Sequence, residues 1–262
     1  MKTDNGFEAN KIPILEYDSS KTAIIEPSRK YRDMQMPERC VMTFFGEVVE
    51  KYSKMSGTRV VGTSRWETRN VEFYEMEYRG QKVGFVHALV GAPVAAALMD
   101  LMIARGAQKI IACGGCGVLD SSIAVGHILI PVAAVRDEGT SYHYLPASRE
   151  ILIDEKGIGA IARTLNRRGV DYLKCKTWTT DAFFRETKAK AERRKKEGCL
   201  SVEMECSALA SVAKFREAGF AQMLYGGDSL DGEAYDDRGW WKNLTFRERL
   251  FVLSLEACQE YD

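Results

Sequence analysis

The chain lacks a net charge, because its 262 residues include 37 basic and 37 acidic side chains. Without an overall field of one sign, attraction to nucleic acid or to an anionic membrane surface is not expected. No apolar run reaches membrane-spanning length, and the N-terminal stretch MKTDNGFEANK has no apolar signal-peptide core. These absences predict a cytoplasmic protein whose partners include neither nucleic acid nor a membrane.

A spaced cysteine framework is also absent. The seven cysteines are scattered and odd in number, which is typical of reduced thiols in the cytosol. Cys113 and Cys116 form a CxxC pair, but no second pair of Cys or His residues accompanies them. We interpret the pair as thiols that line a loop, and we expect no metal site.

A run of basic residues occupies positions 188–196. It contains Glu192, it is followed by Glu197, and no aromatic residue interrupts it. A nucleic-acid-binding stripe usually combines a basic excess with aromatic residues, so this run predicts the solvated face of a helix instead.

Strand patterns and helix patterns alternate along the chain. We expect strands at 22–25, 109–117, 127–137, 171–181, 200–204 and 221–228, with a hairpin over 72–89. Helices are expected at 93–106, 149–169, 184–198, 206–219 and 243–259. The alternation predicts an α/β fold: one three-layer α/β/α domain over 1–262, with a central mixed, mostly parallel sheet and an N-terminal extension at 1–20.

The residues that could carry chemistry lie at the ends of the predicted strands. In open α/β sheets, ligands bind beyond the carboxyl ends of the strands. Here those ends are 114–117, 137–143, 179–184, 203–205 and 226–228. Glycines let the backbone approach a ligand, aromatic rings stack on one, and carboxylates bind hydroxyls or donate a proton. The pattern predicts a cleft for a small molecule with a planar base and a diol.

Four segments carry a resemblance to a known family: CGGCGVL, AVGHILIPVAAVRDEGTSYHY, SVEMECSALASVA and MLYGGDSLD. In this order and spacing they resemble the nucleoside phosphorylases, a family that includes purine nucleoside and uridine phosphorylases and methylthioadenosine-type nucleosidases. The resemblance runs from about Thr22 to Gln259. It implies a pentosyltransferase of nucleoside metabolism and purine salvage that needs no cofactor and takes inorganic phosphate as co-substrate. It also implies a homo-oligomer, either a dimer or a trimer of dimers.

The Glu-Met-Glu segment matches the ribose-binding part of the family. By this match Glu205 accepts hydrogen bonds from the 2′ and 3′ hydroxyls, which an ionised carboxylate does strongly. Met204 packs against the sugar. Glu203 either contacts the ribose or is a strand-end charge paired with an arginine.

Other positions match the family's base pocket. Phe183 is expected to stack on the base, and Cys116 and Gly117 line its pocket. Asp228 matches the acid that protonates N7 of a purine, with Lys242 or Arg238 as the nearby basic residue. A raised pKa would suit Asp228 for that task.

The phosphate site matches the family only in part. Arg29 in IIEPSRKYR, Arg69 in ETRNVEF and the loop residue Gly115 are the expected phosphate-binding positions. Ala112 stands where phosphorylases have an arginine, and Gly115 stands where they have Ser or Thr. Two alternatives follow. Another arginine (Arg32, Arg65 or Arg136) rebuilds the site, or water attacks after activation by a carboxylate near the first strand, a region to which Glu26 is close without occupying the matching position.

The base preference is read from two further positions. Uridine phosphorylases place a Gln and an Arg where this chain has Thr187 and Ala189, so the resemblance favours a purine. The expected reaction is phosphorolysis of a purine nucleoside to free base and ribose 1-phosphate. A uridine phosphorylase-type activity, a hydrolytic nucleosidase and a nucleoside-binding protein with an eroded phosphate site are the alternatives.

Overall fold

The computed structural model describes residues 6–232, 234–242 and 244–262. In this part of the chain, a ten-stranded mixed sheet has helices on both sides. Its strands are β3 (Arg39–Thr43), β4 (Arg59–Ser64), β5 (Val71–Tyr78), β6 (Gln81–His87), β7 (Lys109–Val118), β8 (Ile128–Asp137), β9 (Glu150–Leu152), β10 (Tyr172–Thr180), β11 (Cys199–Glu203) and β12 (Gly219–Ser229). The predicted single three-layer α/β domain with a mixed sheet is therefore confirmed.

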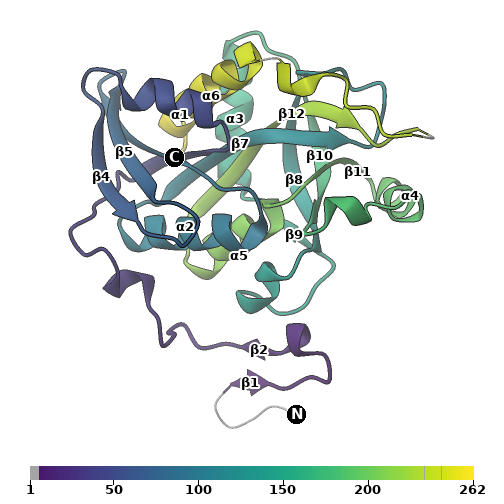
Figure 1. Cartoon of the computed structure of the whole chain (residues 1–262), viewed down its shortest axis with the longest axis horizontal. Coiled ribbons are helices and arrows are strands. Elements are labelled where there is room, and N and C mark those ends of the chain that lie inside the picture. Colours follow the sequence, from purple (N-terminus) through teal and green to yellow (C-terminus); the bar gives the residue numbers. More distant parts are fainter. Residues whose placement is uncertain (1–5, 233, 243) are drawn as a thin grey trace.

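The helices form the two outer layers (Figure 1). They are α1 (Gly46–Ser53), α2 (Ala92–Ala104), α3 (Glu155–Arg167), α4 (Lys188–Lys196), α5 (Cys206–Phe215) and α6 (Leu244–Gln259). Figure 1 shows α1, α3 and α6 on one side of the sheet and α2 and α5 on the other. Short 3-10 turns are η1 (Pro13–Leu15), η2 (Pro27–Arg29), η3 (Thr140–His143), η4 (Phe183–Arg185) and η5 (Trp240–Lys242).

The sheet curls so that part of it closes on itself. The strand order is β11-β10-β8-β12-β7-β3-β6-β5-β4, with β9 at the side of β8. β11 also pairs with β7 through Ser201–Val118 and Val202–Gly117, which closes five strands into a barrel-like ring. This closure brings the C-terminal ends of β7 and β11 together, and it thereby creates the place where the site lies.

Local sequence explains the main helices. α2 has Pro93 in its first turn, where a missing N–H costs nothing, and it is apolar and mostly buried along its length. α3 is amphipathic, and the side chain of Asp154 caps it by accepting a hydrogen bond from the Gly157 N–H at 3.2 Å.

The predicted buried strand at 22–25 is wrong. Residues 22–25 form no strand, and Ile24 is 99% exposed. The first strand of the sheet is β3, whose residues Cys40 to Thr43 are fully buried between β6 and β7. A four-residue apolar run does not reveal whether neighbouring strands will cover it, and here Pro27 begins a 3-10 turn directly afterwards.

Two predicted helices begin later than expected. In the stretch 149–169, residues Glu150–Leu152 pair with β8 as β9, and the helix starts only after its cap at Asp154. In 184–198, η4 comes first, and α4 starts at Lys188 after the Thr187 cap. In both cases a capping side chain, rather than the apolar pattern, sets the first turn.

The N-terminal segment stands apart from the sheet. β1 (Phe7–Glu8) and β2 (Tyr17–Asp18) pair with each other only, and β2 lies against η3 rather than against the main sheet (Figure 1). Lys21 fastens the end of the segment, because its ammonium donates to the Phe215 carbonyl at 2.9 Å and lies 4.3 Å from the centroid of that ring.

Three further findings bear on function. All seven cysteines are buried and free. No helix within the described ranges is long and apolar enough to cross a membrane. Nor do the described residues contain a group of three or more His, Cys, Asp or Glu side chains that could hold a metal ion.

Candidate active site

A cavity of about 420 Å³ opens at the C-terminal ends of β7, β11 and β12. Its walls come from the glycine-rich end of β7, the Glu-Met-Glu segment after β11, the end of β12, the η4 turn and the helix α6. The lining residues are Phe44, Phe45, Val90, Gly114, Gly115, Cys116, Gly117, Phe183, Glu186, Val202, Glu203, Met204, Glu205, Gln222, Tyr225, Gly227, Asp228, Tyr235, Trp240 and Arg247.

Most of the residues selected from the sequence meet in this cavity. Those that line it are Gly115, Cys116, Gly117, Phe183, Glu203, Met204, Glu205 and Asp228. Arg29 and Arg69 are exposed and do not line it.

Glu203 faces protein donors. Its Oε1 accepts from the Thr179 hydroxyl at 2.6 Å, and its Oε2 accepts from the backbone N–H groups of Glu205 and Cys206 at 2.7 and 2.6 Å. Burial raises its pKa, and these three donors oppose that rise by favouring the ionised form. Among the residues that the structure describes, no arginine pairs with Glu203, which instead fixes the turn that leads from β11 into α5.

Glu205 is the more available carboxylate of the pair. It is 5% exposed, and its Oε1 accepts from the Gly91 N–H at 2.6 Å. Gly91 can present that N–H because it adopts a φ of +108°, which favours glycine. Burial and the nearby Glu203 charge both raise the pKa of Glu205. Since Glu203 has more donors, Glu205 is the member of the pair that more readily holds a proton.

Asp228 lies near the end of β12. Regular pairing with β7 is interrupted between Gly226 and Ser229, and Asp228 lies within this interruption. Burial raises the pKa of Asp228, while the Arg238 charge and the Tyr235 hydroxyl oppose the rise. Arg238 braces the same strand end by donating to the carbonyls of Gly227 at 2.8 Å and Ile123 at 2.7 Å. Of the two basic residues expected near Asp228, Arg238 is the one beside it.

An aromatic and acidic wall follows β10. Phe183 is 53% exposed and its ring centroid lies 4.1 Å from that of Phe184. Glu186 was not selected from the sequence, yet it lines the cavity with Asp228. Burial, with a smaller contribution from Asp228, raises the pKa of Glu186 to about 7. The sequence feature that could have identified Glu186 is its position three residues after Phe183.

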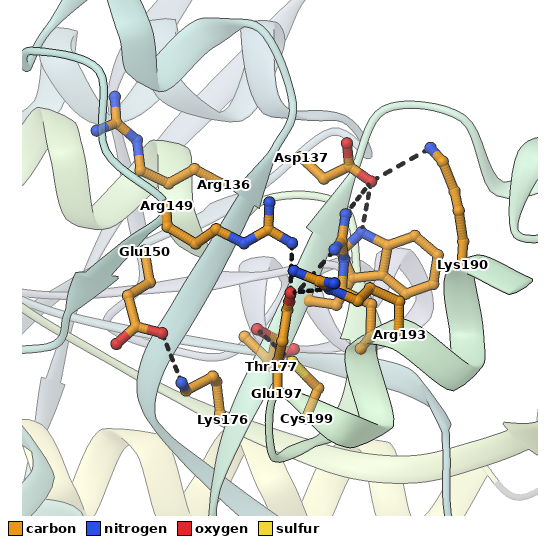
Figure 2. Close-up of polar contacts among 12 residues, drawn as sticks. Arg136, Asp137, Arg149, Glu150, Lys176, Thr177, Lys190, Arg193, Glu197 and Cys199 are labelled. Atoms are coloured by element: carbon orange, nitrogen blue, oxygen red, sulfur yellow. Dashed lines mark hydrogen bonds and ion pairs between the residues drawn. The ribbon is translucent and has the colours of Figure 1, made fainter.

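An ion-pair network holds this wall against the sheet (Figure 2). Asp137 accepts from Trp178 Nε1 at 3.0 Å, from Arg194 Nη2 at 3.0 Å and from Lys190 Nζ at 3.3 Å. Glu197 accepts from Arg193 Nε at 2.7 Å. Arg194 is 7% exposed, so the basic run is not wholly a solvated face as predicted. Instead, the buried Arg194 anchors one side of α4 by its ion pair with Asp137.

The arginines expected to bind phosphate have other surroundings. Arg29 ends η2, which precedes the first strand of the sheet, so it does not follow that strand as its match assumed. Arg69 Nη2 lies 3.2 Å from His87 Nδ1. Arg136 Nη1 donates to Pro146 O and Ser148 Oγ, both at 2.7 Å, and therefore does not rebuild the site. Arg32 and Arg65 do not line the cavity.

Arg247 is the cation that sequence reasoning missed. It projects from α6 into the cavity and pairs with Glu47, to which its Nη2 donates at 3.0 Å. Its guanidinium carbon lies 4.8 Å from the Phe45 ring centroid. Phe44 and Phe45 follow β3 directly and occupy the loop after the first strand of the sheet. Because β3 itself was not predicted, nothing in the local pattern pointed to this loop.

Comparison with curated proteins gives distant relatives. A uridine phosphorylase from Thermococcus kodakarensis is 29% identical over 129 residues, which is 47% of this chain and 47% of that one. A DeoD-type purine nucleoside phosphorylase from Colwellia psychrerythraea is 26% identical over 151 residues, which is 56% of this chain and 64% of that one. The chain therefore spans between about half and two thirds of the length of these relatives.

Solved structures resemble most of the chain. An AMP nucleosidase from Bacteroides thetaiotaomicron superposes with a TM-score of 0.67 at 25% identity, covering 84% of this chain and 86% of that one. A purine nucleoside phosphorylase from Toxoplasma gondii, in complex with immucillin-H, shares the fold with a TM-score of 0.73 at 20% identity over 87% and 91%. The family model of the phosphorylase superfamily matches residues 38–250, from just before β3 into α6. The chain belongs to the phosphorylase superfamily.

Proposed function

We propose that the protein cleaves the N-glycosidic bond of a purine nucleoside, with inorganic phosphate as the nucleophile. Family membership supports a nucleoside phosphorylase or nucleosidase activity. The observation that carries the finer proposal is that Glu205, Asp228 and Phe183 line one cavity. A carboxylate for a diol, an acid for a leaving base and a ring for stacking are the groups that this reaction needs.

In the proposed reaction, the bond between the anomeric carbon and N9 breaks as a bond from a phosphate oxygen to the same carbon forms. Asp228 gives its proton to N7, so the base leaves as a neutral molecule. Its raised pKa makes the protonated form more accessible. Glu205, once ionised, accepts hydrogen bonds from both ribose hydroxyls, and Met204 packs against the sugar. The products are the free base and ribose 1-phosphate.

The purine preference is supported by the wall after β10. Thr187 caps α4, because its hydroxyl accepts from the Lys190 N–H at 3.3 Å, and Ala189 has no polar group. Neither side chain is suited to read uracil. Glu186 faces the same cavity as Asp228, and its carboxylate is a suitable acceptor for an N–H group on the six-membered ring of a purine.

A panel of purine and pyrimidine nucleosides, assayed with and without phosphate, tests this proposal. Turnover of purine nucleosides that requires phosphate is the expected result. Turnover of uridine alone would overturn the base assignment, and turnover without phosphate would overturn the nucleophile. Tight nucleoside binding with no turnover in any condition would identify a binding protein instead.

Hydrolysis is the second candidate. Glu47, at the start of α1, is the first carboxylate after the first strand of the sheet, and it pairs with Arg247 at the cavity. A carboxylate at this place is better located than Glu26 to activate water. Glu47→Gln is expected to remove phosphate-independent turnover if hydrolysis is the true reaction.

We also propose that the protein acts as a homo-oligomer in the cytoplasm. Arg69 is exposed and lies outside the cavity of its own chain, which is compatible with a contribution of its side chain to the cavity of a neighbouring subunit. Light scattering coupled to size exclusion measures the assembly. A fully active monomer would contradict a shared site.

A further inference from the structure

The register between β7 and β12 joins two unusual pairs of residues. Ala112 of β7 lies opposite Gln222 of β12, and Gly115 lies opposite Tyr225. Ala112 stands at the position where a phosphate site is expected to have an arginine, and Gly115 stands where it is expected to have a hydroxyl side chain. Gln222 and Tyr225 are three residues apart in a stretch of regular pairing, so their side chains leave opposite faces of β12. Tyr225 lies on the face that packs against Phe45.

Both β12 side chains line the cavity and carry polar atoms without a partner. Tyr225 and Gln222 are each 1% exposed. Among the described residues, neither the Tyr225 hydroxyl nor Gln222 Oε1 has a hydrogen-bond partner. Leaving such groups buried and unpaired is costly, and a polar ligand in the cavity would remove that cost for the Tyr225 hydroxyl.

A positive charge lies on the Tyr225 side of the cavity. Arg247 is the one cation among the described residues that line the cavity. Phe45 lies between it and Tyr225, with ring centroids 6.0 Å apart for Phe45 and Tyr225 and the Arg247 guanidinium 4.8 Å from Phe45. Glu47 lies along one edge of the guanidinium, 3.0 Å from Nη2 and 2.8 Å from Nε.

We propose that Tyr225 and Arg247 form the subsite for the phosphate nucleophile, with donors moved from β7 to β12 and α6. This inference rests on the proposed phosphorolysis. Tyr225 donates its O–H to one phosphate oxygen, and Arg247 donates to others. Gly115 contributes by leaving room for the Tyr225 ring.

The first test measures the KM for phosphate at saturating purine nucleoside. Tyr225→Phe keeps the ring and removes the hydroxyl, and Arg247→Gln removes the charge. Each is expected to raise the KM for phosphate about 10- to 100-fold, as for the loss of a hydrogen bond to a charged group, with a small change in the KM for nucleoside. Tyr144→Phe and Arg59→Gln, which lie outside the cavity, are the matched controls. An unchanged KM for phosphate in both site variants would overturn the proposal.

A second measurement separates this proposal from the proposed function. Calorimetric titration of inorganic phosphate alone, without nucleoside, reports the subsite even if the wild type proves not to need phosphate for turnover. Binding by the wild type that Tyr225→Phe and Arg247→Gln both weaken supports the subsite. Absence of phosphate binding by the wild type, or equal binding by all three proteins, overturns it.

A swap variant tests whether both strands serve the same ion. Gly115→Ser combined with Tyr225→Thr returns a hydroxyl to β7 and removes the ring that a serine would strike. It is expected to bind phosphate more tightly than Tyr225→Thr alone, with thermal unfolding checked in both. Equal affinity in two folded proteins would contradict a shared subsite.

Discussion

The hydroxyl oxygen of Tyr225 lies 3.2 Å from the position that a Cβ atom at Gly115 would take, and the nearest ring carbon lies 3.1 Å from it. These distances are close to the limit for contact between non-bonded atoms. Gly115 therefore makes space for a ring on the neighbouring strand. The absence of a side chain at Gly115 on β7 and the presence of the Tyr225 ring on β12 are therefore linked, because the ring occupies the space that a side chain at Gly115 would need.

Replacing Asp228 with Asn should remove most turnover of purine nucleosides. An amide cannot give a proton to N7, and general acid catalysis typically contributes about 10²- to 10⁴-fold. Steady-state kinetics measure the loss, and thermal unfolding should change little. The exposed Asp171→Asn is the matched control. Wild-type kcat in Asp228→Asn would remove this residue from the mechanism.

Substitutions of Glu203 and Glu205 should have different effects: the first should mainly lower stability, and the second should mainly weaken substrate binding. Glu203→Ala leaves three donors without an acceptor, so we expect it to lower the free energy of unfolding by at least about 3 kcal/mol. Glu205→Ala frees only the Gly91 N–H and should cost less stability, but it should raise the KM for ribonucleosides strongly. Denaturant unfolding and kinetics of both variants test the contrast, and the reverse order would refute it.

The raised pKa of Glu205 should make the free protein less stable as pH rises. A carboxyl that binds its proton more tightly in the folded state stabilises the fold at low pH. That stability is lost between its ordinary pKa of 4.5 and the raised value. Glu205→Gln should therefore gain stability relative to the wild type from about pH 5 to about pH 8. Unfolding at several pH values, without ligand, measures the difference, and parallel curves would contradict the shift.

Removing Asp137 should loosen the wall that carries Phe183 and Glu186. Asp137→Ala leaves Trp178 Nε1 and Arg194 Nη2 without their acceptor, so a loss of about 1–3 kcal/mol in unfolding free energy is expected. The KM for nucleoside should rise with it. Glu150→Ala breaks a more exposed pair with Lys176, and it should change stability by less than about 1 kcal/mol. Equal effects of the two substitutions would show that the network does not anchor α4.

Local patterns were sufficient for much of the fold. Apolar runs ending in glycine or acid predicted β7, β8, β10 and β12, and capping residues explain where α3 and α4 begin. β3 was missed because its five residues carry no turn signal and are defined only by their neighbours. The error at 22–25 has the same origin, since a short apolar run is buried only if other strands cover it.

The sequence by itself determined the α/β class and one part of the cavity lining, because Phe183, Glu205 and Asp228 each lie at or just after the end of a strand whose local pattern is strong. Only the tertiary structure decided which residues line the rest of the cavity. The match for Arg29 depended on a strand that does not form, while Arg247, Gln222 and Tyr225 reach the cavity through an α6 packing position and a β7–β12 register. Pairing between residues about 110 positions apart depends on how the strands of the sheet assemble, which no local pattern encodes.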